Sequence, residues 1–116
     1  MNLRGKSDSG EFPSAQAVKL SDMVSYQDGS IVSRTIIKEK SGTLTLFAFD
    51  AGQSLSEHTS PYQAFVQVID GEVELIIGGE RIVAEKGKTV LMPADIPHAV
   101  HANERFKMLL IMVRQT

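Results

Sequence analysis

Three histidines, His58, His98 and His101, are the side chains of this 116-residue chain best suited to metal or proton chemistry. The chain has no cysteine, which excludes disulfide bonds and thiolate metal sites. Any metal must therefore be bound by imidazole together with carboxylate, amide, hydroxyl or water. His98 directly follows Pro97, a spacing that predicts a turn and then a strand beginning at the histidine. If His58 and His98 meet in space, they mark the candidate site.

Other kinds of catalytic site find little support. Ser60 stands two residues after His58, so on a strand its hydroxyl lies beside the imidazole, which argues against a hydrolase triad. Gly78-Gly79 is typical of a hairpin turn, and no helix follows it to bind a phosphate group. The sequence therefore offers a histidine pair without an attached nucleophile.

The overall charge excludes two classes of partner. The chain has 12 basic and 14 acidic residues, a net charge of −2, and the basic residues are scattered. We therefore expect binding to neither nucleic acid nor a membrane. The polar N-terminus is not that of a signal peptide, and no run is long enough to span a bilayer. These features predict a soluble, cytoplasmic protein.

Short strand-like segments follow one another between turn residues, at the spacing of roughly 8 to 12 residues that is typical of an antiparallel sandwich or barrel. Asp70-Gly71 and Gly78-Gly79 predict two hairpins. No convincing amphipathic helix is present, so the fold class is all-β. The predicted strands span residues 31–38, 43–49, 64–69, 72–77, 80–84, 89–92 and 106–113.

The chain is short enough to form one domain. We expect a flexible or edge-strand arm at residues 1–16 and a single barrel domain at 17–116. The last strand, 106–113, is apolar on both faces, as is the region of Phe47 and Phe49. A small barrel has little interior to cover two faces, so we expect a homodimer, with a covering loop or a thicker core as the alternative.

The spacing of the motif residues resembles that of the two motifs of the cupin superfamily. The residues that carry this resemblance are Gly52-x5-His58-x-Ser60-x3-Ala64-x6-Gly71 and Gly87-x5-Pro93-x-Asp95-x2-His98. The resemblance implies an antiparallel double-stranded β-helix, or jelly-roll barrel, of the small RmlC-like kind, with a degenerate first motif. Asp95 replaces a motif glycine and is a residue that tolerates left-handed geometry, so the turn is still expected.

In the cupin family two histidines and a glutamate of the first motif, with a histidine of the second, bind a divalent metal. Carried over by position, His58 and His98 are kept, whereas Ser60 and Ala64 replace the second histidine and the glutamate. Gln63 is adjacent to the glutamate position, but strand alternation directs it to the other face unless a bulge turns it inward. Two readings remain open: the pair binds Zn, Ni, Fe or Mn, or it lines a metal-free pocket.

This comparison predicts a pocket inside the barrel around His58 and His98. The expected pocket residues are Ser60, Tyr62, Gln63, Ala64 and Met92. The predicted function is binding of a small molecule, with or without help from a metal. The alternative is a metal-dependent enzyme, an oxygenase or isomerase acting on a small metabolite, so whether the chain is an enzyme stays open. A purely structural role would leave both histidines important for stability alone.

Overall fold

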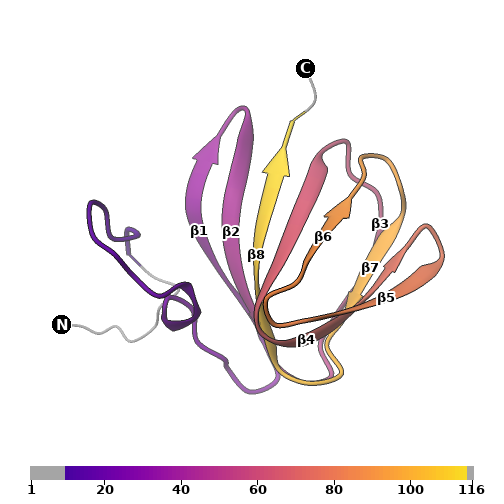
Figure 1. The fold of residues 1–116 in the computed structure, drawn as a ribbon, viewed down its shortest axis with the longest axis horizontal. Helices are drawn as coiled ribbons and strands as arrows, with labels where there is room; N and C mark the ends of the chain where they lie inside the picture. Colours follow the sequence, from indigo (N-terminus) through magenta and orange to yellow (C-terminus); the bar gives the residue numbers. More distant parts are fainter. Residues whose placement is uncertain (1–9, 115–116) are drawn as a thin grey trace.

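Eight antiparallel strands make up the protein in a computed structural model that describes residues 10–114 (Figure 1). They are β1 (Ile31–Glu39), β2 (Gly42–Phe49), β3 (Ser54–His58), β4 (Gln63–Ile77), β5 (Glu80–Glu85), β6 (Thr89–Met92), β7 (His98–His101) and β8 (Phe106–Val113). A single 3-10 turn, η1 (Leu20–Asp22), precedes them. The all-β jelly-roll prediction is confirmed. Residues 1–9 of the predicted arm lie outside the described residues, and those from 10 to 16 form no strand. Within 10–114, no helix is long and apolar enough to cross a membrane.

Strand β4 joins the two halves of the barrel. The hydrogen-bonded order is β1-β2-β8-β4-β7-β3, and β5 and β6 also pair with β4. The first half of β4 pairs with β8 and β6, whereas its second half pairs with β5 and β7. In Figure 1, β1, β2 and β8 therefore form one wall and β3, β5 and β7 the other.

The hairpin predicted at Asp70-Gly71 is wrong. β4 continues through these residues, with a register shift between Val68 and Asp70 where it bends from one wall to the other. Gly71 has φ +69°, and a Cβ atom there would lie 2.1 Å from the carbonyl oxygen of Arg105. The local signal for a turn was real, but pairing with β8 on both sides of the bend keeps the strand continuous.

Two other turn predictions are confirmed. Gly78 and Gly79 have φ +58° and +85° and form the tight connection from β4 to β5, where residues without a Cβ adopt such angles easily. Asp95 has φ +65°, as expected for a residue that replaces the motif glycine. The loop that leads into His98 therefore keeps its left-handed bend without a glycine.

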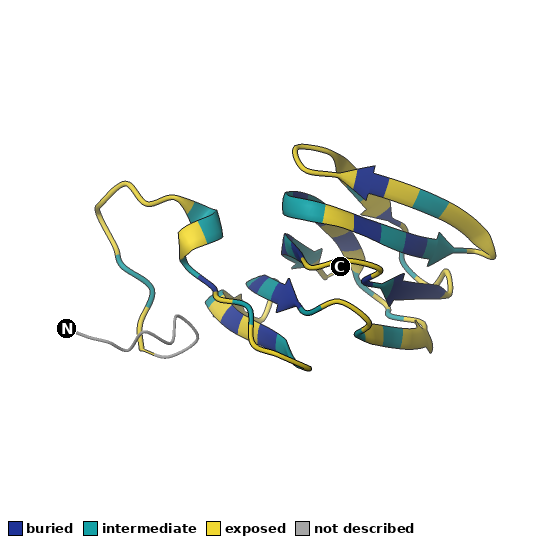
Figure 2. Cartoon of the chain, turned by 90° about the horizontal axis from the view of Figure 1, so that it is seen from below, coloured by how far each residue is buried: buried dark blue, intermediate teal, exposed yellow. Residues whose placement is uncertain are grey.

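The outer face of the β1-β2-β8 wall is partly covered by the segment before β1. Val24 is fully buried against Leu46 and Ala48 of β2 and Leu109 of β8. Along β1 buried and exposed residues alternate from Val32 to Thr35, whereas β2 has no exposed residue; Figure 2 colours the strands by this burial. The covering segment, offered as the alternative to a second subunit, thus accounts for one part of the doubly apolar wall.

Polar contacts fix this segment to the barrel. Arg34, buried on β1, donates to the carbonyl oxygen of Met23 at 3.1 Å. The Tyr26 hydroxyl donates to Asp70 at 2.5 Å, and burial together with this carboxylate raises the pKa of Tyr26. Lys107 lies over the Tyr26 ring, 4.8 Å from its centroid. The segment is therefore held at the end of the barrel where β4 bends.

Candidate functional site

The two motif histidines are direct neighbours in the structure. His58 is the last residue of β3, His98 is the first of β7, and the two are cross-strand partners. Their ring centroids are 4.4 Å apart and the ring planes make an angle of 65°. An irregularity in β3 between Leu55 and His58 makes this possible, because the extra residue returns His58 to the face of Leu55. Residues 40 positions apart thereby form one site.

Both imidazoles use the same nitrogen to bond the backbone. Nδ1 of His58 lies 2.8 Å from the carbonyl oxygen of Ser56, and Nδ1 of His98 lies 3.1 Å from that of Ile96. A carbonyl oxygen only accepts hydrogen bonds, so each Nδ1 must carry the proton. In the neutral ring Nε2 then has a free lone pair. The pair thus presents two Nε2 atoms able to accept a hydrogen bond or bind a metal.

The pair lies at the boundary between the barrel interior and solvent. His98 is only 6% exposed, whereas His58 is an exposed residue at the end of β3. The loops that flank the pair are joined, because the amide of Asp95 donates to the carbonyl oxygen of Ser60 at 2.8 Å. One imidazole is therefore anchored in the wall while the other can be reached from outside.

Burial along the inner face shows which end of the barrel is filled. Phe49, Phe106 and Met108 are buried at the end where β4 bends, with the two phenyl rings stacked at 4.6 Å. On the same face of β8, Leu110 and Met112 are only partly buried. The interior is therefore closed by side chains at one end and accessible at the other, where β3 ends and β7 begins.

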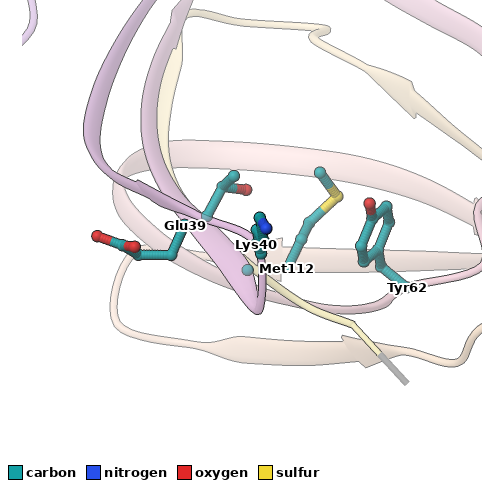
Figure 3. A pocket seen from close by; sticks show the side chains of 6 residues that line it. Glu39, Lys40, Tyr62 and Met112 are labelled. Carbon is teal, nitrogen blue, oxygen red and sulfur yellow. The ribbon is translucent and has the colours of Figure 1, made fainter. Parts of the chain in front are cut away.

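Tyr62 lies at the rim of the accessible end, between two hollows. One, of about 80 Å³, is lined by Tyr62, Met112, Thr43 and the β1–β2 turn (Figure 3). Figure 3 shows the Tyr62 and Met112 side chains next to each other and the Glu39 carboxylate directed away from them. The other hollow, of about 290 Å³, is lined by Pro61, Tyr62, Asp95 and Arg114. Tyr62 is thus well placed to contact a ligand that enters the barrel.

The remaining predicted pocket residues occupy different environments. Ala64 and Met92 are buried cross-strand partners on β4 and β6. The Ser60 hydroxyl accepts a hydrogen bond from the Tyr62 amide at 3.1 Å, so it shapes the loop. Gln63 is exposed and lies on the face of β4 opposite to Ala64. Its predicted place in the pocket, and its lesser role as a metal ligand, therefore find no support in the geometry.

The donor set does not complete the family's metal centre. Among the residues described, no group of three or more histidine, aspartate or glutamate side chains could together hold an ion. Two imidazoles without a carboxylate leave a divalent ion short of ligands and its charge uncompensated. Water or a bound ligand would have to supply the other donors.

Two contributors to the site were not singled out from the sequence. Met112 lines the rim because it shares the inward face of β8 with Phe106, Met108 and Leu110, an alternation that is visible in the sequence. Arg114 lines the larger hollow from the residue after β8, and no sequence pattern indicated it. The Nδ1 contacts with backbone carbonyls likewise depend on loop geometry.

Comparison with known proteins gives a consistent result for the fold. The cupin domain family matches residues 45–114. A conserved protein of unknown function from Streptococcus pyogenes is 34% identical over 92% of this chain and 94% of its own length, with a TM-score of 0.88. No curated protein matches the chain.

Two further solved structures extend the comparison. A cupin 2 conserved barrel domain protein from Leptotrichia buccalis is 41% identical over 81% of this chain, with a TM-score of 0.79, and the chain spans 46% of that protein. A cupin superfamily protein from Desulfitobacterium hafniense is 21% identical over 99% of this chain and 100% of its own, with a TM-score of 0.84. The second of these similarities concerns the fold alone.

Proposed function

The chain belongs to the cupin domain family, and on this premise we propose that it binds a small, uncharged, largely apolar molecule at the His58–His98 pair. The observation that carries this proposal is the chemistry of the inward-facing side chains at the accessible end. Those of β2, β4, β6 and β8 are apolar or carry a hydroxyl: Thr43, Thr45, Ala64, Met92, Leu110 and Met112. The cations at this end are exposed residues: Lys38, which is the registered partner of Thr43, and Lys40 and Arg114, which line the two hollows.

The histidine pair gives this apolar site its polar contact. With Nδ1 bonded to a carbonyl oxygen in each ring, Nε2 accepts a hydrogen bond from a hydroxyl or N–H group of the ligand. Such a bond contributes about 1 kcal/mol, and apolar contact adds about 25 cal/mol for each Å² of ligand surface removed from water. Apolar contact therefore supplies most of the affinity, and the imidazoles select the position of the donor group.

The hollows at the rim, which neither histidine lines, border the entrance to the site and so limit the size of the ligand. Their volumes are about 80 and 290 Å³, whereas sites for drug-sized molecules occupy roughly 300 to 1,000 Å³. A single substituted ring or a short branched chain fits this space. Tyr62, which borders both hollows, is the residue that such a ligand passes on entry.

The second candidate function is a metal-dependent enzyme of the oxygenase or isomerase type. The free Nε2 atoms favour it, because metal-binding histidines commonly donate their other ring N–H to a carbonyl oxygen or carboxylate. A metal here would act as a Lewis acid and would need further donors from substrate or water. The missing third and fourth protein ligands place this candidate behind simple binding.

Calorimetric titration with three matched probes tests the binding proposal. Phenol is neutral and carries a donor, toluene is neutral without one, and benzoate is an anion of similar size. We expect phenol to bind most tightly and benzoate least. Changing His58 and His98 together to Ala should remove the preference of phenol over toluene, whereas His101→Ala, on the opposite face of β7 from His98, should retain it. Tighter binding of benzoate than of phenol would overturn the proposal.

Metal analysis separates the two candidates. The protein is purified without chelators, and a second sample is reconstituted with Zn²⁺, Ni²⁺, Mn²⁺ or Fe²⁺. Stoichiometric metal that is lost when His58 and His98 are both changed to Ala contradicts metal-free binding. Absence of bound metal in both samples contradicts the metalloenzyme.

A further inference from the structure

Two methionine side chains flank Ala64 on the inner face of the barrel. In the registered pairing, Ala64 of β4 faces Met112 of β8 on one side and Met92 of β6 on the other. Ala64 is 3% exposed and Met92 4%, whereas Met112 is partly buried. Because the side chain of Ala64 is a single methyl group, the space above it is left to its two longer neighbours. The two thioether groups therefore border one place in the interior, at the accessible end.

The His58–His98 pair lies on the facing wall at the same end. His98 shares the inner face of β7 with Val100, which belongs to the same packed cluster as Ala64 and Met92. Ala64 follows His58 by six residues, His98 follows Met92 by six, and these two connections are hydrogen-bonded to each other. Facing sheets pack about 10 Å apart, a gap that is filled by the side chains of both. The thioethers and the imidazoles therefore project into the same part of the barrel.

All four of these donor groups are neutral, and two of them are soft. A thioether sulfur is uncharged and polarisable, and each imidazole is neutral with its proton on Nδ1. Four neutral donors leave the charge of a divalent ion uncompensated. Soft thioether ligands select Cu(I), whereas carboxylate and carbonyl oxygens suit harder divalent ions. The donor set thus fits a soft monovalent cation better than the divalent metals of the second candidate function.

We propose that the histidine pair and the two methionines bind one Cu(I) ion, through two Nε2 atoms and two thioether sulfurs. The inference goes beyond both candidate functions, in which Met92 and Met112 supply apolar contact alone. Cu(I) uses the same Nε2 atoms as the hydroxyl or N–H group of an organic ligand. The copper-bound protein and the organic complex are therefore alternative states of one site.

The rim of the barrel gives an ion a way to this site. Met112 lines the hollow of about 80 Å³ together with Thr43 and Tyr62. Figure 3 shows the ring of Tyr62 next to the Met112 side chain, an arrangement in which sulfur and aromatic groups attract each other. A small ion can thus reach the sulfur of Met112 from solvent, while the ring limits the access of water to it.

Copper titration with matched methionine variants tests the site. The protein is titrated with Cu(I) under nitrogen, with ascorbate as the reductant and bicinchoninate as the competing chelator. We expect one Cu(I) for each chain, which an equal concentration of Zn²⁺ does not displace. Met92→Leu combined with Met112→Leu keeps the interior filled, because Met and Leu have similar volumes. Its affinity for Cu(I) should fall at least about 100-fold, since loss of a mere supporting partner of a metal ligand costs about 10- to 100-fold.

Met108→Leu is the control for this titration. Met108 lies on the same face of β8 but is 2% exposed at the end that Phe49 and Phe106 fill, so this variant should bind Cu(I) as the unmodified chain does. The proposal is overturned if the unmodified chain takes no Cu(I) from the chelator, if Zn²⁺ displaces the copper, or if the double methionine variant binds Cu(I) as tightly as the unmodified chain.

X-ray absorption spectroscopy at the copper edge identifies the ligand atoms directly. We expect sulfur and nitrogen neighbours of copper in the unmodified chain, and no sulfur in the double methionine variant. Copper bound by nitrogen and oxygen alone in the unmodified chain would overturn the proposal. The two proposals for this site can fail separately, because phenol is titrated into metal-free protein. There the double methionine variant should still prefer phenol to toluene, whether or not the unmodified chain binds copper.

Discussion

The ring of His58 meets the ring of His98 only because β3 contains one residue more than the strand it pairs with. Between the Leu55–Val100 and His58–His98 pairs, β3 advances three residues and β7 only two. In a regular strand an odd spacing would put Leu55 and His58 on opposite faces. The irregularity therefore both creates the pair and fixes its distance of 4.4 Å.

The first prediction concerns the protonation state of the two rings. Because Nδ1 of each ring bonds a carbonyl oxygen, we expect both neutral histidines to carry the proton on Nδ1 and none on Nε2. Nitrogen-detected NMR of ¹⁵N-histidine-labelled protein above pH 8 separates the two tautomers. A protonated Nε2 on both rings would contradict both proposed functions, since each requires a free lone pair.

The second prediction separates the structural roles of the histidines. His98 is buried, so His98→Ala removes packed atoms and should lower the free energy of unfolding by about 1 to 3 kcal/mol. His58 is exposed, and His58→Ala should change this energy by no more than about 0.5 kcal/mol. Urea denaturation measures both. Equal losses for the two variants would mean that His58 is also a packing residue.

The same pair of histidines shows which features of the site can be predicted from the sequence and which cannot. Motif spacing predicted that His58 and His98 would meet, as they do, and turn residues placed β8 at 106–113 as observed. The spacing could not reveal that each Nδ1 bonds a carbonyl oxygen two residues earlier, because this depends on the fold of the two loops. Strand alternation already directed Gln63 away from the pocket, as observed, but it could not show that Met112 lines the rim.

The error at Asp70-Gly71 has a similar cause. An Asp-Gly pair favours a hairpin when only local preferences act. Here β8 pairs with β4 on both sides of the bend. Gly71 does not form a hairpin turn but allows the backbone of Arg105 to approach closely. Pairing partners distant in the sequence therefore overrode the local signal, as they often do in strands.

The third prediction tests whether the close approach of Gly71 to the backbone of Arg105 requires a glycine. Gly71→Ala places a Cβ 2.1 Å from the Arg105 carbonyl oxygen in addition to requiring a positive φ. We expect the free energy of unfolding to fall by about 2 to 5 kcal/mol, the sum of left-handed strain and overpacking. Gly52→Ala is the control, because Gly52 also has a positive φ, +87°, but a Cβ added there would meet no atom within 4 Å. This variant should lower the free energy of unfolding by only about 1 to 2 kcal/mol. Chemical denaturation of the two variants measures the difference. Equal losses of stability would show that the backbone near Arg105 moves to make room for the added methyl group.

The fourth prediction concerns acid stability at the closed end of the barrel. Asp50 accepts hydrogen bonds from Nε of Arg105 at 2.7 Å and from the amide of Gly29 at 2.6 Å. These contacts, the first more than the second, hold the pKa of Asp50 below its ordinary value of 3.8. A carboxylate whose pKa is lowered by folding stabilises the protein above its unfolded pKa, and this contribution is lost as the pH falls through the folded value.

Stability should therefore fall below about pH 4 in the unmodified protein, and part of this fall should be absent in Asp50→Asn. The variant is less stable at pH 7, because the ion pair with Arg105 is lost there, and the two curves should converge as the pH is lowered. Glu57→Gln, at an exposed position of β3, serves as the control and should follow the unmodified curve. Thermal unfolding at a series of pH values measures the three curves. A constant gap between Asp50→Asn and the unmodified protein from pH 7 to pH 2 would show that Asp50 contributes through packing and not through its charge.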